Sequence, residues 1–188
     1  MRPEVFDIEP EIIKGCVKGS LKYQEMLYRK FYAYGMSITL RYTKSREEAI
    51  EVLNDSFLKV YENIKKFDLE KSFKTWFRQI TVNTSIDQYR KSKRMIITDD
   101  IDNYESEAFE TDKINELEFE DILSLLKSIP EHYAIVFNLY EIEGFNHNEI
   151  AEKLNISDST SRANLSRAKK MLRELFKKQY YNTYAGVV

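Results

Sequence analysis

The sequence predicts an all-α protein of two small helical domains joined by an acidic linker, and three observations support this fold class. The 188 residues include only 5 Gly and 3 Pro, which favours helices over loop-rich sandwiches and barrels. Apolar residues recur at helical spacing in several stretches. Net charge also divides the chain, with +6 over residues 1–96, −10 over residues 97–121 and +2 over residues 122–188.

Composition excludes several classes of protein. The single cysteine, Cys16, rules out an internal disulfide framework and any multi-thiolate metal site. Scarce glycine argues against enzymes whose Gly-rich loops cradle phosphates. No apolar run approaches the ~20 residues of a membrane span, and the N-terminus has no signal-peptide core, so we expect a soluble cytoplasmic protein. His132 and His147 are isolated in the sequence, and we expect surface or helix-end positions for them rather than a catalytic or metal-binding pair.

The first block predicts three helices, over residues 20–41, 47–61 and 73–92. The helix over residues 47–61 has the clearest apolar stripe. Leu58 falls outside that stripe, on the outer face beside Asn54 and Asp55. This arrangement is either an ordinary exposed leucine or a docking surface for a partner.

Aromatic residues and a basic run share the predicted helix over residues 73–92. We expect Phe77 and Ile80 to lie in the core. The basic run Tyr89-Arg-Lys-Ser-Lys-Arg94 follows them. Such a combination suits either ordinary packing or single-stranded nucleic acid, where bases stack on rings while Lys and Arg hold phosphates.

The acidic strip over residues 97–121 has the character of a linker. It is dense in like charge, and its apolar residues keep no clear period. Two interpretations remain open at this point: a solvated spacer, or a segment whose negative charge mimics nucleic acid in a basic channel.

The third block predicts a pair of helices joined by a tight turn. Asn146, with Glu149 three residues later, indicates the N-cap of a helix of about two turns. Asn155 and Ile156 turn the chain. Ser157 indicates the N-cap of a last helix that runs to about residue 178. The arrangement is that of a helix-turn-helix.

The last helix has an apolar side and a basic side. The predicted apolar side carries Leu165, Ala168, Leu172, Leu175 and Phe176. The other side carries Ser159, Arg162, Ala163, Ser166, Arg167 and Lys170. Small residues among basic ones let a helix approach the major groove, where Arg donates to guanine and Lys holds phosphate. The alternative is a solvated basic face on an ordinary helical hairpin.

Three spaced motifs together carry a family resemblance. They are Ala49-Ile-Glu-Val-Leu-Asn-Asp-Ser-Phe-Leu-Lys-Val-Tyr61, Trp76-Phe-Arg-Gln-Ile-Thr-Val-Asn83, and a segment from Ile129-Pro130 through Leu154-Asn-Ile-Ser157 to Leu172-Arg173. In this order they resemble the bacterial sigma-70 family of transcription initiation factors. The match is to the small extracytoplasmic-function (ECF) type, which has only the σ2 and σ4 domains. The resemblance implies a σ2 domain over residues 1–96 and a σ4 helix-turn-helix domain over residues 122–188.

The resemblance implies core RNA polymerase and promoter DNA as partners. The helix over residues 47–61 would dock on the clamp coiled coil of the polymerase through Glu51, Asn54, Asp55 and Leu58. The σ2 domain would melt the minus-10 element with Trp76, with Asn83 beside the pocket for a flipped base, and with Arg90, Lys91, Lys93 and Arg94 on the backbone. The σ4 domain would read the minus-35 element with Ser159, Thr160, Arg162, Ala163, Ser166, Arg167 and Lys170.

One residue departs from the pattern of the family. Ser161 stands where the family usually has Val, yet its phase points to the apolar side. We expect its hydroxyl to find a partner, such as a backbone carbonyl one turn back.

The resemblance also gives the linker and the remaining partners a place. The linker would thread the RNA-exit channel of the polymerase, and an anti-sigma factor is an implied partner. We expect no cofactor, no small-molecule substrate and no enzymatic activity, because catalysis belongs to the polymerase. Two alternatives are a stand-alone regulator with a σ4-like output domain, and an interaction protein that binds polymerase or an anti-sigma factor without initiating. The stand-alone regulator would leave the motifs at Ala49–Tyr61 and Trp76–Arg94 unexplained.

Overall fold

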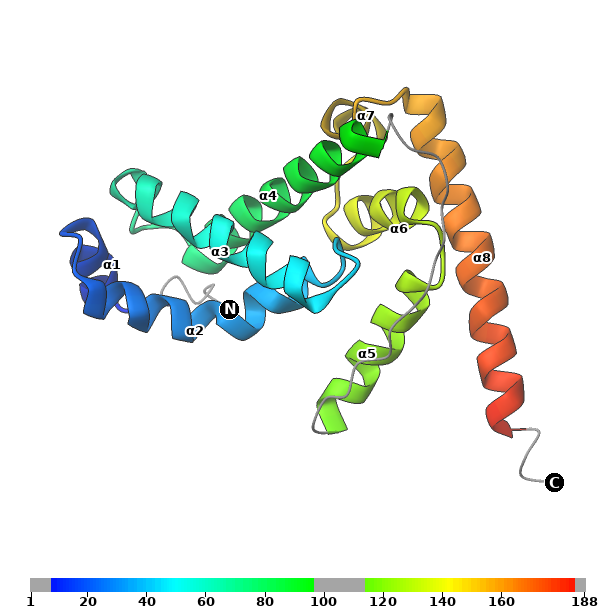
Figure 1. Cartoon of the computed structure of the whole chain (residues 1–188), viewed down its shortest axis with the longest axis horizontal. Helices are drawn as coiled ribbons and strands as arrows, with labels where there is room; N and C mark the ends of the chain where they lie inside the picture. Colours follow the sequence, from blue (N-terminus) through cyan, green and yellow to red (C-terminus); the bar gives the residue numbers. More distant parts are fainter. Residues whose placement is uncertain (1–7, 97–113, 185–188) are drawn as a thin grey trace. The chain divides into compact units, whose positions relative to one another are not determined.

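The chain forms helices throughout the part that the structure, a computed structural model, describes (Figure 1). That part comprises residues 8–96 and 114–184, with side chains over residues 8–93 and 120–178. The chain divides into two compact units, with the boundary between Asp99 and Asp100. Within the described ranges, none of the helices combines the length and apolarity that crossing a membrane requires.

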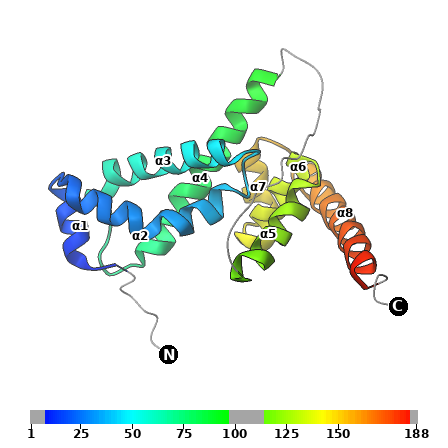
Figure 2. The same ribbon diagram turned by 60° about the horizontal axis from the view of Figure 1, so that its bottom comes forward.

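The first unit contains four α-helices within residues 8–96, the part of it that the structure describes. These are α1 (Pro10–Val17), α2 (Leu21–Thr39), α3 (Arg46–Asn63), followed by the short 3₁₀ turn η1 (Ile64–Lys66), and α4 (Phe73–Ile96). Helices α2, α3 and α4 pack against one another, and Figure 2 shows α2 and α3 side by side. The three helices predicted in this block are confirmed.

Helix α1 was not among the predicted helices. It is only eight residues long, which is too short to show a clear period in the sequence. Its apolar residues Ile12, Ile13 and Cys16 are buried, and the helix packs against α2. Its stability therefore comes from tertiary packing rather than from its own propensity.

Aromatic rings fill the core of the first unit. Phe31, Phe57, Phe73 and Phe77 are all buried. The ring centroids lie 4.8 Å apart between Phe31 and Phe73, and 4.9 Å apart between Phe57 and Phe77. Rings at such distances add about 0.5–1.5 kcal/mol per pair beyond the burial of their area. The predicted core position of Phe77 is confirmed, and Ile80 packs against the same cluster from a partly buried position.

Gly35 allows α2 to lie close to its neighbours in the first unit. A Cβ atom at this position would overlap the side chain of Leu53 on α3 and lie 3.1 Å from Phe77 on α4. A larger residue at position 35 would therefore force the buried Leu53 side chain to shift and would press on the Phe77 ring.

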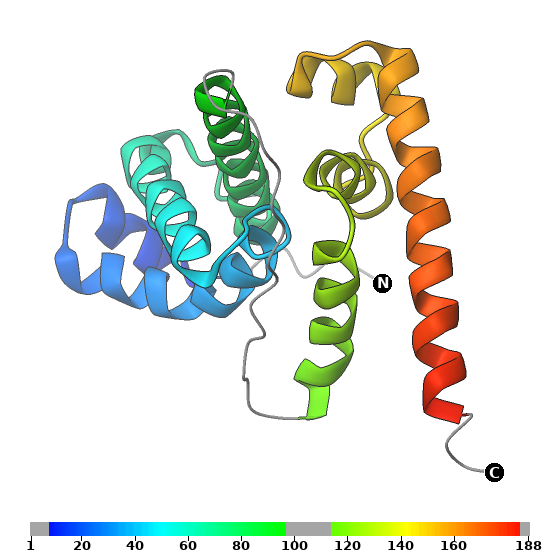
Figure 3. The same ribbon diagram turned by 45° about the vertical axis from the view of Figure 1, so that its right-hand side comes forward.

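The second unit contains the helices α5 (Ile114–Lys127), α6 (Glu131–Phe137), α7 (His147–Leu154) and α8 (Asp158–Tyr184). A π-helical turn, η2 (Asn138–Ile142), follows α6 directly. Helix α8 packs against α5, α6 and α7, and Figure 3 shows it running past both α6 and α7.

Helix α5 begins inside the segment predicted as the acidic linker. Residues 114–121 of that segment are helical, whereas residues 97–113 lie outside the described residues. The physical reason is that acidic residues are compatible with the first turns of a helix, where the helix dipole is positive. The apolar residues Leu123 and Leu126 further along α5 are buried and hold the helix in the unit.

The predicted turn between the last two helices is confirmed. At the start of α7, the Glu149 amide donates to Asn146 Oδ1 at 3.0 Å, and the Asn146 amide donates to Glu149 Oε2 at 2.8 Å. Asn155 ends α7 in the left-handed conformation, with φ of 54°. The Thr160 amide then donates to Ser157 Oγ at 3.0 Å and caps α8.

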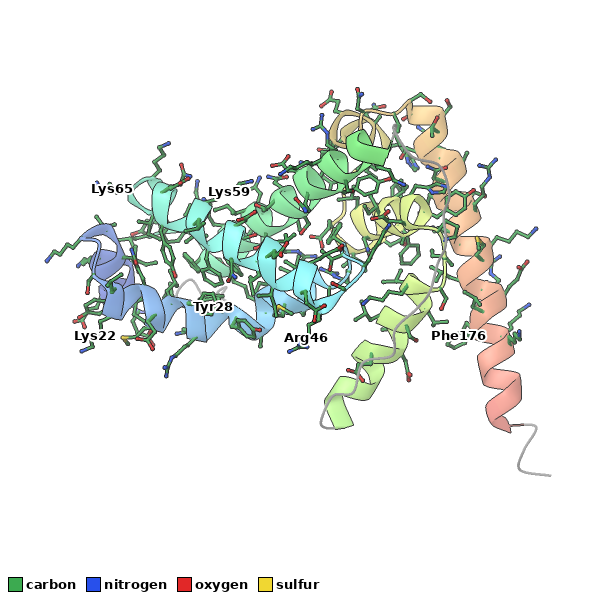
Figure 4. All side chains as sticks on the ribbon, viewed as in Figure 1. Lys22, Tyr28, Arg46, Lys59, Lys65 and Phe176 are labelled. Atoms are coloured by element: carbon green, nitrogen blue, oxygen red, sulfur yellow. The ribbon has the colours of Figure 1, made fainter. Side chains whose placement is uncertain are left out.

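Helix α8 buries the predicted apolar side with one exception. Leu165 and Ala168 are buried, and Leu172 and Leu175 pack against the core from partly buried positions. Phe176, labelled in Figure 4, was predicted on this side, but 52% of its surface is exposed. At 100° per residue it lies at the edge of the buried stripe rather than at its centre.

Candidate nucleic-acid interface

The outer face of α8 presents small and basic side chains to solvent. The exposed residues of this face include all seven that were predicted to contact DNA: Ser159, Thr160, Arg162, Ala163, Ser166, Arg167 and Lys170. Ser161, Asn164, Leu165 and Ala168 are buried on the opposite side. The phase of the helix is therefore the predicted one, and the seven residues are accessible to a ligand. Their contact with DNA stays a prediction.

Arg162 is held by an acidic residue one turn earlier. Its Nε donates to Asp158 Oδ1 at 2.6 Å, and its Nη2 donates to Asp158 Oδ2 at 3.3 Å. These hydrogen bonds and the charge of Asp158 raise the pKa of Arg162. Because the Arg162 side chain is exposed, a guanine or phosphate oxygen has access to the guanidinium.

Arg167 is supported from α6. Its Nη1 donates a long hydrogen bond of 3.5 Å to the Tyr133 hydroxyl, and its guanidinium lies 6.0 Å from the centroid of the Tyr133 ring. The aromatic ring limits the positions that the Arg167 side chain can take. Tyr133 was not identified from the sequence, because α6 and α8 are far apart along the chain.

Ser161 has a different partner from the predicted one. Its side chain is completely buried, and its Oγ shares a hydrogen bond of 2.9 Å with His147 Nδ1. The prediction that this hydroxyl has a partner is confirmed, and the partner is the His147 ring rather than a backbone carbonyl. The reason is that His147 is the first residue of α7, and its ring reaches the hydroxyl across the turn. The predicted helix-end position of His147 is confirmed.

One face of α4 carries three of the predicted site residues at two-turn intervals. Trp76, Asn83 and Arg90 are each seven residues apart, which places them on the same side of a helix. All three side chains are partly buried. The Trp76 ring packs against Phe67 and Phe73, with centroid distances of 5.1 and 5.6 Å. Trp76 thus supports the core, and its contact with DNA stays a prediction.

The predicted basic run occupies the last turns of α4. Lys91 is exposed, whereas Arg90 and Lys93 are partly buried. The ammonium group of Lys93 lies 5.8 Å from the centroid of the Tyr89 ring. Arg94 belongs to the same helix, but its side chain lies outside the described residues. Cations at this end of a helix interact favourably with the helix dipole.

The outer face of α3 is exposed as predicted. Glu51, Asn54 and Asp55 are exposed, and 58% of Leu58 is open to solvent. Tyr28 on α2, labelled in Figure 4, donates from its hydroxyl to Asn54 Oδ1 at 3.1 Å. The sequence did not point to Tyr28, because a contact between two helices leaves no local signal.

The described residues contain no group of three or more His, Cys, Asp and Glu side chains arranged to hold a metal ion. The outer face of α8 instead carries basic and small side chains, and the last turns of α4 carry basic side chains next to Tyr89. A helix-turn-helix with a basic outer face is the architecture of a DNA-binding protein.

Comparison with known proteins identifies the family to which the chain belongs. The profile "Sigma-70 region 2" matches residues 27–95, and the profile "Sigma-70, region 4" matches residues 119–172. The chain therefore belongs to the sigma-70 family of RNA polymerase sigma factors.

Similar proteins carry the names of sigma factors, some of them of the ECF type. The ECF RNA polymerase sigma factor SigM of Bacillus subtilis is 27% identical over 139 residues, which span 73% of this chain and 85% of SigM. The RNA polymerase sigma factor SigZ of the same organism is 30% identical over 125 residues, or 66% of this chain and 70% of SigZ. The sigma factor RpoE of Bartonella quintana, solved with the anti-sigma factor NepR, shares the fold with a TM-score of 0.55 at 20% identity, covering 84% of this chain and 98% of RpoE.

Proposed function

We propose that this chain is a transcription initiation factor that binds core RNA polymerase and directs it to promoters. The observation that carries the proposal is the presence of both sigma-70 regions, in the order of the family, in one chain. A stand-alone regulator with a σ4-like domain would leave the region 2 match over residues 27–95 without a function.

The second unit has the role of reading the minus-35 element. Its outer α8 face fits the major groove, because Ala163 and Ser166 are small enough for a close approach. Arg162 and Arg167 supply paired donors suited to guanine, and Lys170 supplies a charge suited to phosphate. The predicted domain over residues 122–188 is extended in this proposal to the start of α5 at Ile114.

The first unit has the roles of holding the minus-10 element open and docking on the polymerase. The α4 face with Trp76, Asn83 and Arg90 lies next to the basic end of the same helix, and unstacking a base requires both a pocket and a track for the backbone. On α3, Leu58 and its polar neighbours supply an exposed apolar centre with a polar rim for the polymerase.

The remaining expectations follow from this role. The chain acts with the polymerase in the cytoplasm, and the catalytic chemistry belongs to the polymerase. An anti-sigma factor is a further partner, as NepR is for RpoE in the Bartonella quintana complex. The linker hypothesis concerns Asp99, Asp100, Asp102, Glu105 and Glu107, which lie outside the described residues. Neutralising these five should weaken transcription by the holoenzyme.

Run-off transcription with purified core polymerase tests the proposal. The template is the DNA upstream of the gene for this chain, and we expect transcripts from one defined start. Core polymerase alone should give none. DNA binding without polymerase and without a start would indicate a stand-alone regulator. Polymerase binding without a start from any candidate promoter would indicate an interaction protein.

Substitution of Arg167 by Ala tests, in the same assay, whether this side chain reads a base. We expect a loss of about fivefold to hundredfold in transcription, because one paired Arg–guanine contact contributes roughly 1–3 kcal/mol. Lys177→Ala is the matched control, since Lys177 is an exposed cation further along α8. Equal losses in the two variants would contradict the assignment of Arg167 to base reading.

A further inference from the structure

Side chains from η2, α7 and α8 meet around the ring of Tyr140. We call this group the Tyr140 cluster, and its members are Tyr140 and Glu141 of η2, His147 of α7, and Ser161 and Lys169 of α8. None of the five was predicted to contact DNA or polymerase.

The contacts within the cluster are close and of several kinds. The His147 ring stacks on the Tyr140 ring, with centroids 4.6 Å apart and an angle of 26° between the planes. The same imidazole shares its 2.9 Å hydrogen bond with the buried hydroxyl of Ser161. Lys169 Nζ lies 2.6 Å from Glu141 Oε1 and 5.8 Å from the centroid of the Tyr140 ring.

These contacts hold α8 at two separate points. Ser161 and Lys169 are eight residues apart, which corresponds to about 12 Å along a helix. Arg162 and Arg167, from the outer face, lie between them in the sequence. A tilt or slide of α8 would break the buried Ser161–His147 hydrogen bond, and the solvent-exposed Lys169–Glu141 pair adds a weaker attachment, so the cluster contributes to where the outer side chains point.

The π-helical turn determines the position of Tyr140. The Glu143 amide donates to the Asn138 carbonyl at 2.9 Å, which is the five-residue spacing of a π-helix. Such turns are rare, and they occur frequently at functional sites. Because a π-turn has more residues than an α-helical turn, it changes the direction in which Tyr140 and Glu141 leave the backbone.

We propose that the Tyr140 cluster sets the orientation of α8 and thereby the base preference of this chain at the minus-35 element. The proposal rests on the proposed function. The five residues are positioning residues, since they act through the exposed face of α8 rather than by contact with DNA. The buried Ser161 hydroxyl makes a directional hydrogen bond, whereas an apolar side chain at this position would have no preferred direction.

The test compares the sequences that holoenzymes select from a DNA library randomised over the minus-35 region. His147→Phe keeps an aromatic ring for Tyr140 and removes the hydrogen bond to Ser161. Lys169→Met keeps the side-chain length and removes the charge that pairs with Glu141. Lys177→Met is the matched control, because it removes an exposed cation of α8 outside the cluster.

We expect the two cluster variants to change the order of preferred sequences. The sequence that the wild-type holoenzyme prefers should weaken roughly twofold to tenfold relative to others, which corresponds to the net contribution of one hydrogen bond. Lys177→Met should lower all sequences equally. A uniform loss in the cluster variants, with an unchanged order, would overturn the inference because it indicates a merely structural role.

The double variant His147→Phe/Ser161→Val separates positioning from folding. Replacing both partners by apolar groups is close to neutral for stability, so thermal unfolding should return toward that of the wild type. We expect its selected sequences to remain shifted. A return to the wild-type order would contradict the role of the hydrogen bond. A wild-type holoenzyme that selects no sequence would overturn the proposed function and this inference together.

Discussion

The two units hold their functional helices in different ways. In the first unit, α4 is anchored by Phe73 and Phe77 within a continuous cluster of aromatic rings. In the second unit, α8 buries smaller side chains such as Ala168. Polar contacts of its residues Ser161 and Lys169 join it to α7 and η2. Apolar burial stabilises a helix without fixing its direction, whereas hydrogen bonds and ion pairs are directional. The position of α4 in the first unit therefore depends on apolar packing, and the orientation of α8 in the second unit depends on directional polar contacts.

The largest expected effect comes from opening the aromatic core. Phe77→Ala should lower the free energy of unfolding of the first unit by about 3–5 kcal/mol, because it removes a completely buried ring and leaves a cavity. The chain has one tryptophan, Trp76, which packs in this unit, so its fluorescence during urea unfolding reports the change. Leu58→Ala, at an exposed position, is the control, with an effect within about 0.5 kcal/mol.

If Phe77→Ala lowers the free energy of unfolding by less than about 1.5 kcal/mol, the stated difference between the two units is contradicted. It would mean that the rings of the first unit rearrange to fill the space, and that tight packing does not hold α4 in place.

The single thiol gives a second measure of the packed unit. Burial raises the pKa of Cys16 to about 11, because the charged thiolate is poorly solvated inside the protein. At pH 8 we expect iodoacetamide to modify folded protein roughly a hundredfold more slowly than unfolded chain, since the thiolate is the reactive form. Mass spectrometry over time measures the rate. Fast modification of the folded wild type would contradict tight packing of α1 against α2.

The start of α7 tests the dependence of the second unit on polar contacts. Asn146→Ala should cost about 1 kcal/mol, because the Glu149 amide loses its side-chain acceptor. Hydrogen exchange of the α7 amides measures the change within that unit. Asn148→Ala, on the same helix and without a capping role, is the matched control. Equal effects of the two substitutions would argue against the cap.

The smallest effect is expected for a polar contact in the first unit. Lys59 Nζ on α3 lies 3.2 Å from Asp87 Oδ2 on α4, and the exposed fractions of the two side chains are 44% and 62%. Lys59→Met should change the free energy of unfolding by less than about 1 kcal/mol, because solvent screens such pairs. Urea unfolding followed by Trp76 fluorescence measures it. A cost above about 2 kcal/mol would show that directional contacts matter in both units.

Most helices of the fold could be predicted from the sequence, because periodic apolar residues and capping residues are local signals. The helix-turn-helix is the clearest case, since Asn146, Asn155 and Ser157 each stand where the structure has a cap or a turn. Helix α1, helix α5 and the π-turn were not predicted. Helix α1 has only eight residues and, unlike α7, no side chain that caps its start, and the acidic residues of α5 resembled a linker.

The residues of the candidate site could be predicted from the sequence to a similar degree. The exposed face of α8 followed from the phase of one helix. The supporting residues did not, because Tyr28, Tyr133 and Tyr140 reach the site residues or α8 from other elements. No spacing within one helix identifies such a residue.

The sequence by itself determined the helices, their caps, the basic outer face of α8 and the sigma-70 resemblance that the comparisons support. All of these depend on residues a few positions apart, whose side chains lie on one helix or in one turn. Only the tertiary structure decided which residues support those faces. Ser161 and its partner His147 are separated by fourteen positions and a turn, and the π-turn that places Tyr140 has no signature in the side chains. The contacts that orient α8 are therefore a property of the packed unit.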